Sequence, residues 1–190
     1  EALLDLRART MELADAYVER LGAELAIPRD PGLNPPRWEL GHVAWFQEWW
    51  IARNRERALG HRADPDHERP PATLDGADPM FDRSRVAHAP GGTLPLRPIG
   101  EVRHWLASTL EATLSHLDAL PPSATHDELY FFRLVALHEA MHAEAASYMA
   151  LPLGFRVPGL ASAPVADGEI EVPAQAFRRG GGEDGFCFDN

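Results

Sequence analysis

Residues 137–144 read Leu-His-Glu-Ala-Met-His-Ala-Glu and carry two histidines four positions apart. Residues with this spacing lie on one face of a helix, so His138 and His142 can direct both imidazoles at one point. A third candidate, His42, lies far upstream in residues 38–46, which read Trp-Glu-Leu-Gly-His-Val-Ala-Trp-Phe. An imidazole from a packed neighbouring helix would complete a three-histidine site with open positions for water, oxygen or substrate. Such a site suits catalysis better than structural metal binding.

Four predicted helical segments account for most of the chain, and two of them contain these motifs. Apolar spacing, prolines and a capping box predict helices over residues 2–25, 35–59, 101–120 and 125–150. Helices of this length predict a mainly α fold, an antiparallel four-helix bundle with ligands projecting inward from facing helices.

Outside the four helices, we expect a long loop and, at the end of the chain, the start of a second domain. Residues 60–99 are rich in Pro, Gly, Asp and Arg and predict a long loop with one short helix near residues 78–82. We expect the bundle to occupy residues 1–155 and a linker to follow over residues 156–168. Residues 169–190 mix Ile, Val and Phe with Gly and Pro, which predicts the start of a β-containing domain that is incomplete here.

The composition excludes several classes of partner. The chain has 190 residues, of which 45% are hydrophobic, and a formal net charge of -11. This charge argues against a nucleic-acid partner or an anionic membrane surface. The sequence lacks an apolar run long enough for a transmembrane helix. The single Cys187 cannot form an internal disulfide, which fits a reducing, cytoplasmic location. Composition does not indicate the oligomeric state.

The motif His138-Glu139-x-x-His142 also matches the H-E-x-x-H pattern of zinc metalloproteases, in which Glu139 would be the general base. Those enzymes take their third ligand from downstream, and the sequence has no histidine after His142. We therefore favour a site shared with His42, although ordinary core or surface histidines are the alternative. Glu139 can then orient a ligand imidazole from outside the coordination sphere, or it can form an unrelated salt bridge.

Three further residues are candidates for binding substrate. Trp45 belongs to a dense aromatic cluster whose faces can hold a quaternary ammonium group, with plain core packing as the alternative. Arg83 and Arg85 form a basic pair in an otherwise acidic chain. They can bind an anionic or hydroxyl-rich substrate, or anchor the loop through surface salt bridges.

Residues 36–46 and 138–144 together resemble the N-terminal DinB-like domain of the ergothioneine-type sulfoxide synthases. Residues 172–190 resemble the start of the second domain of that family, which has the formylglycine-generating-enzyme fold. The resemblance implies a nonheme Fe(II) enzyme whose ligands are His42, His138 and His142. It also implies O2-dependent joining of a sulfur or selenium donor to C2 of the imidazole of hercynine (Nα-trimethylhistidine). The assisting tyrosine of the family would lie beyond Asn190, and the family places donor contacts in the loop of Arg83 and Arg85.

Two departures from the common pattern resemble the selenoneine synthase branch. Met141 stands where the sulfur-using branch usually has Gln, and residues 40–46 read Leu-Gly-His-Val-Ala-Trp-Phe in place of Leu-Ala-His-Thr-Thr-Trp-Phe. We therefore expect Met141 to lie near the substrate and a selenosugar to be the donor. The alternatives are an ergothioneine-pathway enzyme using a thiol such as γ-glutamylcysteine, a zinc hydrolase or DinB-type thiol transferase, and a non-catalytic bundle that binds a partner. Three histidines accept several metals, so the ligand set does not identify Fe(II).

Overall fold

The computed structural model describes residues 1–28, 30, 32–82, 95–159, 168–169, 171–177 and 186. These residues form helices and no strand, which confirms the mainly α prediction. The elements in chain order are α1 (Ala2–Leu21), α2 (Pro36–Trp50), the 3-10 helix η1 (Arg57–Arg62), α3 (Ala77–Phe81), α4 (Ile99–Asp118) and α5 (His126–Met149). None of the helices in these ranges combines the length and apolarity needed to cross a bilayer.

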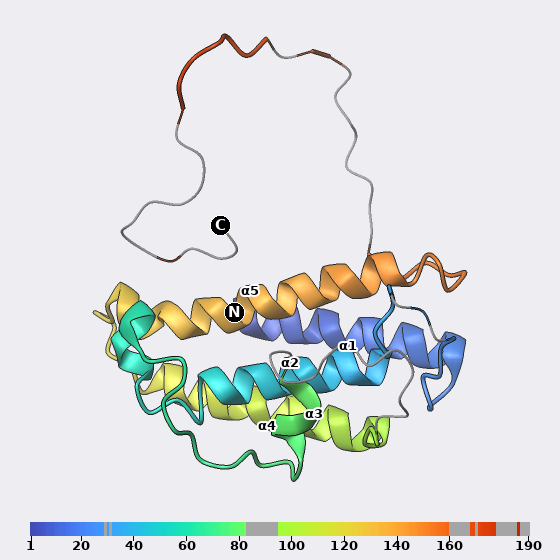
Figure 1. Cartoon of the computed structure of the whole chain (residues 1–190), viewed down its shortest axis with the longest axis horizontal. Coiled ribbons are helices and arrows are strands. Elements are labelled where there is room, and N and C mark those ends of the chain that lie inside the picture. The colour runs from blue at the N-terminus through green and yellow to red at the C-terminus, as the bar shows by residue number, and fades with distance from the viewer. Residues whose placement is uncertain are drawn as a thin grey trace.

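The four long helices form the predicted bundle (Figure 1). Helices α1 and α5 run in one direction and α2 and α4 in the other, so one parallel pair is antiparallel to the other. Helix α2 packs mainly on α4, and α5 packs on both α1 and α2. A parallel pair of neighbours needs a long crossover connection. Residues 51–98 provide it between α2 and α4, and they include η1 and the short helix α3 near its predicted place.

Two helix ends differ from the sequence prediction. Helix α1 ends at Leu21 because Gly22 adopts a φ of 77° and its N–H bonds back to Val18, so the chain turns before the expected residue 25. Helix α2 ends at Trp50, well before the expected residue 59. Beyond that point the guanidinium of Arg53 binds Pro70 and Asp78 of the crossover. Tertiary contacts of this kind override the continuing helical pattern of the sequence.

The predicted start of α5 is confirmed in detail. The Thr125 hydroxyl accepts a hydrogen bond from the Glu128 N–H, and the Glu128 carboxylate accepts one from the Thr125 N–H. This reciprocal capping box satisfies two N–H groups that have no partner within the helix. It fixes where α5 begins and therefore the rotational phase of His138 and His142 along it.

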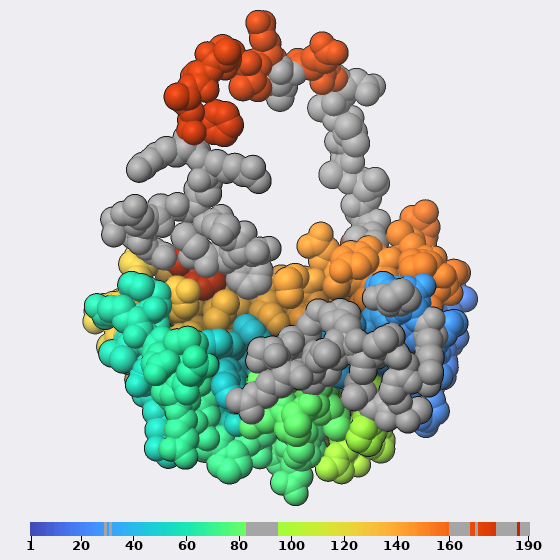
Figure 2. All heavy atoms as spheres, viewed as in Figure 1, coloured from blue at the N-terminus to red at the C-terminus, as the bar shows by residue number. Residues whose placement is uncertain are grey.

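Among the described residues, the core consists of three neighbouring apolar clusters. The first lies between α2, α3 and α4 and is dominated by aromatic residues, among them Trp38, Trp45, Phe81 and Trp105. The others lie where α1 meets the end of α5 and where the start of α5 meets Ile51. Each fully buried large side chain contributes about 1.5–3 kcal/mol to folding. Figure 2 shows the crossover, in teal to green, covering part of α2 in cyan.

The predicted second domain falls mostly on residues that the structure does not describe. The described residues of the tail, 168–169, 171–177 and 186, are irregular. The division into residues 1–155, 156–168 and 169–190 therefore stays a prediction.

Candidate metal centre

Helices α2 and α5 bring His42, His138 and His142 together at the middle of the bundle. The Nε2 atom of His138 lies 3.2 Å from Nε2 of His42 and 3.1 Å from Nε2 of His142. His42 and His138 are buried and His142 is partly buried. In the described part of the chain, their donor atoms all lie within 4.8 Å of one another. The predicted histidines therefore converge as a set that can hold one metal ion.

Hydrogen bonds at Nδ1 orient the rings of His42 and His142, so that the Nε2 atom of each ring faces the other histidines. Nδ1 of His42 lies 2.9 Å from the carbonyl oxygen of Phe81, and Nδ1 of His142 lies 2.5 Å from a carboxylate oxygen of Glu39. A carbonyl or carboxylate oxygen accepts, so each Nδ1 carries the proton and each Nε2 presents a lone pair. Protein metal sites commonly fix the tautomer and orientation of ligating histidines in this way.

Two of the imidazoles are stacked against aromatic rings. Phe46 stacks on His138 with ring centroids 3.5 Å apart and planes 6° apart. Trp38 stacks on His42 with centroids 4.8 Å apart and planes 9° apart. These contacts restrict rotation of the imidazoles and exclude water from one face of each ring, which preorganises the cluster.

The local electrostatics keep His138 in the neutral form that binds metals. Burial, followed by the neighbouring imidazoles of His142 and His42, lowers the pKa of His138 far below its usual value. Burial alone would raise the pKa of Glu39, but the hydrogen bonds from His142 and Asn34 hold it below its usual value. Imidazole ligands such as His138 suit iron, zinc and similar ions better than magnesium or calcium, which prefer oxygen ligands.

Glu139 does not contact the cluster, although it directly follows His138 in the sequence. Its carboxylate accepts hydrogen bonds from Arg7 at 2.7 and 3.1 Å and from Thr10 at 2.7 Å. Consecutive residues on a helix are about 100° apart around the axis, so Glu139 faces α1 instead of the imidazoles. The orienting role predicted for Glu139 is taken at His142 by Glu39, which the sequence reasoning missed. The available signal was the position of Glu39 one turn before His42.

The same contacts bear on the zinc-protease alternative. A general base must reach the proton that it abstracts, directly or through one water. The carboxylate of Glu139 is 2% exposed and is bound by Arg7 and Thr10. This arrangement gives Glu139 a structural role and keeps it from acting as a base at the histidine cluster.

The predicted substrate-binding residues lie in different surroundings. Trp45 is buried, donates from Nε1 to Asp78 at 2.8 Å and lies with its ring 5.8 Å from that of His42. Met141 precedes His142 on α5 and is 41% exposed. Arg83 and Arg85 lie outside the described residues. A substrate contact at any of these four side chains stays a prediction.

Comparison with known proteins finds similarity over the part of the chain that contains the histidine cluster. Residues 2–146, which include all three histidines, match the family model of the DinB superfamily. The chain belongs to this superfamily. It is 29% identical over 174 residues to hercynine oxygenase of Mycolicibacterium smegmatis, covering 92% of this chain and 36% of that protein. It is 32% identical over 143 residues to hercynine oxygenase of Mycolicibacterium thermoresistibile, covering 75% of this chain and 28% of that protein. It is also 31% identical over 140 residues to hercynine oxygenase of Mycobacterium tuberculosis, covering 73% of this chain and 28% of that protein.

This DinB-superfamily chain therefore spans about a third of the length of the curated relatives that it matches. The match to the superfamily covers α1, α2 and α4 completely and α5 beyond His142. The histidine cluster thus lies wholly inside the DinB-like part of the molecule.

Proposed function

We propose that this chain is the metal-binding domain of a nonheme Fe(II), O2-dependent enzyme that acts on hercynine. The observation that carries the proposal is the convergence of three Nε2 atoms, two of them fixed by outer hydrogen bonds at Nδ1. His42, His138 and His142 are the proposed ligands. When bound, Fe(II) supplies an open coordination site at which O2 can be used for oxidative bond formation. The names of the three relatives support hercynine as the substrate.

The proposed product has a selenium or sulfur atom attached to C2 of the hercynine imidazole. We favour a C–Se bond and a selenosugar donor because Met141 and residues 40–46 resemble the corresponding positions of the selenoneine synthase branch. The alternative is an ergothioneine-pathway sulfoxide synthase that uses a thiol such as γ-glutamylcysteine.

The other residues have supporting parts in this proposal. Glu39 and the Phe81 carbonyl hold the ligand imidazoles in the required tautomer, and Phe46 excludes water from one face of His138. Trp45 contributes an aromatic face near the trimethylammonium group of hercynine. Arg83 and Arg85 bind the chalcogen donor.

The remaining parts of the proposal concern the whole protein. The resemblance of residues 172–190 supports a second domain of formylglycine-generating-enzyme type, beginning near residue 169, which supplies the assisting tyrosine. We place the enzyme in the cytoplasm with small-molecule partners alone.

The test uses the full-length protein with Fe(II), hercynine and air, and offers a selenosugar and γ-glutamylcysteine in separate reactions. Mass spectrometry detects the adduct and an electrode follows O2. A selenium adduct alone supports the selenoneine branch, and a sulfur adduct alone supports the ergothioneine branch. Absence of both adducts, with O2 unconsumed, contradicts the oxygenase proposal. The His138→Ala variant and an anaerobic reaction are the controls, and neither is expected to form product.

A further inference from the structure

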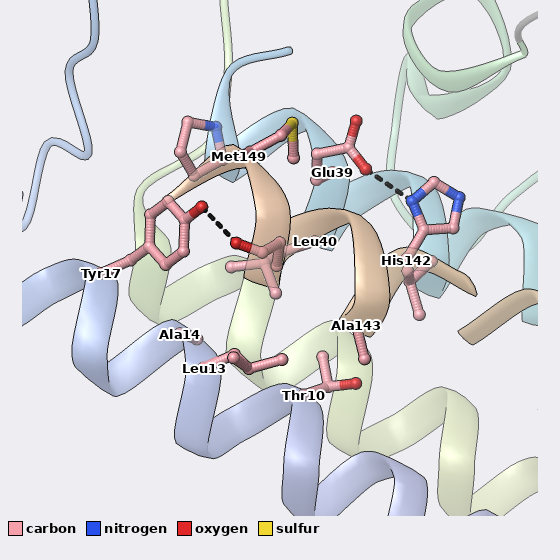
Figure 3. Close-up of a pocket in the computed structure, with 12 residues that line it drawn as sticks. Thr10, Leu13, Ala14, Tyr17, Glu39, Leu40, His142, Ala143 and Met149 are labelled. Carbon is pink, nitrogen blue, oxygen red and sulfur yellow. Dashed lines mark hydrogen bonds and ion pairs between the residues drawn. The ribbon is translucent and has the colours of Figure 1, made fainter. Parts of the chain in front are cut away.

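An apolar cavity of about 40 Å³ lies between α1, α2 and α5, and His142 of the histidine cluster is part of its wall (Figure 3). Most of its wall is aliphatic and includes Leu13, Ala14, Leu40, Val43 and Ala143. Leu40 and Ala143 are partly exposed, so the cavity approaches the protein surface beside them. The cavity is too small for hercynine, a sugar or a peptide thiol. It can accommodate only a molecule of a few atoms.

The polar groups in the cavity wall already have partners. The Tyr17 hydroxyl donates to the Ala146 carbonyl at 2.7 Å, and the Thr10 hydroxyl donates to Glu139 at 2.7 Å. The Glu39 carboxylate is bound by His142 and by the Asn34 amide, each at 2.5 Å. A buried water needs two to four polar partners, and apolar cavities that lack them stay dry and bind apolar guests such as xenon. Because most of the wall is aliphatic and both hydroxyl protons are already donated, the cavity suits a small apolar guest better than a water.

The position of the cavity connects it with the proposed chemistry. Glu39 and His142, which line it, are the same two residues whose hydrogen bond orients one imidazole of the cluster (Figure 3). A guest in the cavity would lie against the outer side of that imidazole. We propose that this cavity is a binding site for an apolar diatomic gas, and that it serves dioxygen to the histidine cluster. The proposal rests on the proposed O2-dependent function for its second half only.

Xenon is the probe, since it enters dry apolar cavities and is visible by its anomalous scattering. Crystals of the full-length protein are pressurised with xenon in the wild type and in Val43→Ile, which adds one methylene to the cavity wall. Val135→Ile is the matched control, because Val135 is equally buried but belongs to the cluster at the start of α5. Ala14→Val is a second filling variant if Val43→Ile fails to fold. The KM for O2 is measured in solution for the same proteins.

We expect xenon in the cavity of the wild type and of Val135→Ile, and at least a several-fold lower occupancy in Val43→Ile. We also expect a several-fold higher KM for O2 in Val43→Ile with kcat close to the wild-type value. Absence of xenon from the wild-type cavity, with O2 consumption intact, overturns the cavity proposal alone. Xenon binding that Val43→Ile abolishes without changing the KM for O2 overturns the role in O2 delivery. Absence of O2 consumption from every variant, with xenon bound, overturns the proposed function and the O2 assignment together.

Discussion

Two buried carboxylates lie close to the histidine motifs, and the bundle uses them differently. Glu139 follows His138 in the sequence, yet it forms an ion pair with Arg7 of α1. Glu39 lies on another helix from His142, yet its carboxylate is 2.5 Å from that imidazole. On a helix the next residue faces a different neighbour, whereas a residue on a facing helix can point at the same place. Proximity in sequence is therefore a poor guide to which acid serves the site.

The region around Glu139 holds the bundle together. The Arg7 guanidinium is buried and binds Glu139 of α5, Gln47 of α2 at 2.6 Å and the Leu106 carbonyl of α4. One side chain thus connects all four long helices. The Glu39 carboxylate makes fewer contacts, and one of them is with the candidate metal ligand His142. We expect the first region to determine stability and the second to determine metal affinity.

Removing the cation from the first region gives the largest expected effect. Arg7→Met leaves the Glu139 carboxylate buried without its partner, and breaking a buried ion pair in this way costs about 3–5 kcal/mol. Urea unfolding of the metal-free protein measures the loss, and adding Glu139→Gln should restore part of it. The exposed pair of Arg103 and Asp15 is the control, for which Arg103→Met should cost less than about 1 kcal/mol. Equal losses in the two variants would contradict the structural role of Arg7.

Substitution of Gly41, next to His42, tests the contact between His42 and Phe81 of the crossover. A Cβ at Gly41 would lie 2.4 Å from two ring atoms of Phe81, whose side chain is fully buried. Gly41→Ala must therefore displace Phe81, and overpacking of this kind costs about 1–3 kcal/mol. The displacement also moves the carbonyl that fixes His42, so metal affinity should fall as well. Urea unfolding and metal titration measure the two effects.

Gly100→Ala is the matched control for this substitution. Gly100 lies in α4 with open space where a Cβ would be placed, so alanine should raise the free energy of unfolding by about 0.5–1 kcal/mol. A stabilised Gly41→Ala variant with unchanged metal affinity would show that Phe81 does not position His42.

Removing the charge at Glu39 tests the second region. Glu39→Gln keeps the shape of the side chain but weakens the hydrogen bond to Nδ1 of His142, and loss of such outer partners lowers metal affinity about 10–100-fold. Competition with a coloured chelator measures the affinity. Glu139→Gln is the matched variant, with the same chemical change in the other region. It should lower stability and leave affinity within a few-fold, and the reverse pattern would contradict the division between the two carboxylates.

The sequence predicted the features that depend on local spacing. His138 and His142 share a helical face wherever that helix packs, and the Thr125 capping box forms within a single turn. The end of α2 and the roles of Glu39 and Arg7 depend on contacts between segments far apart in the chain. Arg7 and Glu139 are 132 positions apart, and nothing in the sequence near either residue indicates the other. The spacing of the histidines therefore predicted the cluster, but not the groups that support it.

His116 lies outside the cluster, and its effect on the pH dependence of stability is the smallest that we predict. This effect can be measured in the metal-free protein. Burial, followed by the charge of Arg57, lowers the pKa of His116 in the folded protein below the ordinary value of 6.5. The unfolded chain therefore binds more protons as the pH falls below about 6.5, and the free energy of unfolding falls with it. His116→Gln should remove part of this slope between pH 7.5 and 5.5, by less than about 1 kcal/mol because the side chain is only half-buried. Urea unfolding of the metal-free protein at the two pH values measures the slope, and the exposed His104 of the same helix provides the control, His104→Gln. A slope that His116→Gln leaves unchanged would place the acid sensitivity of the metal-free bundle elsewhere.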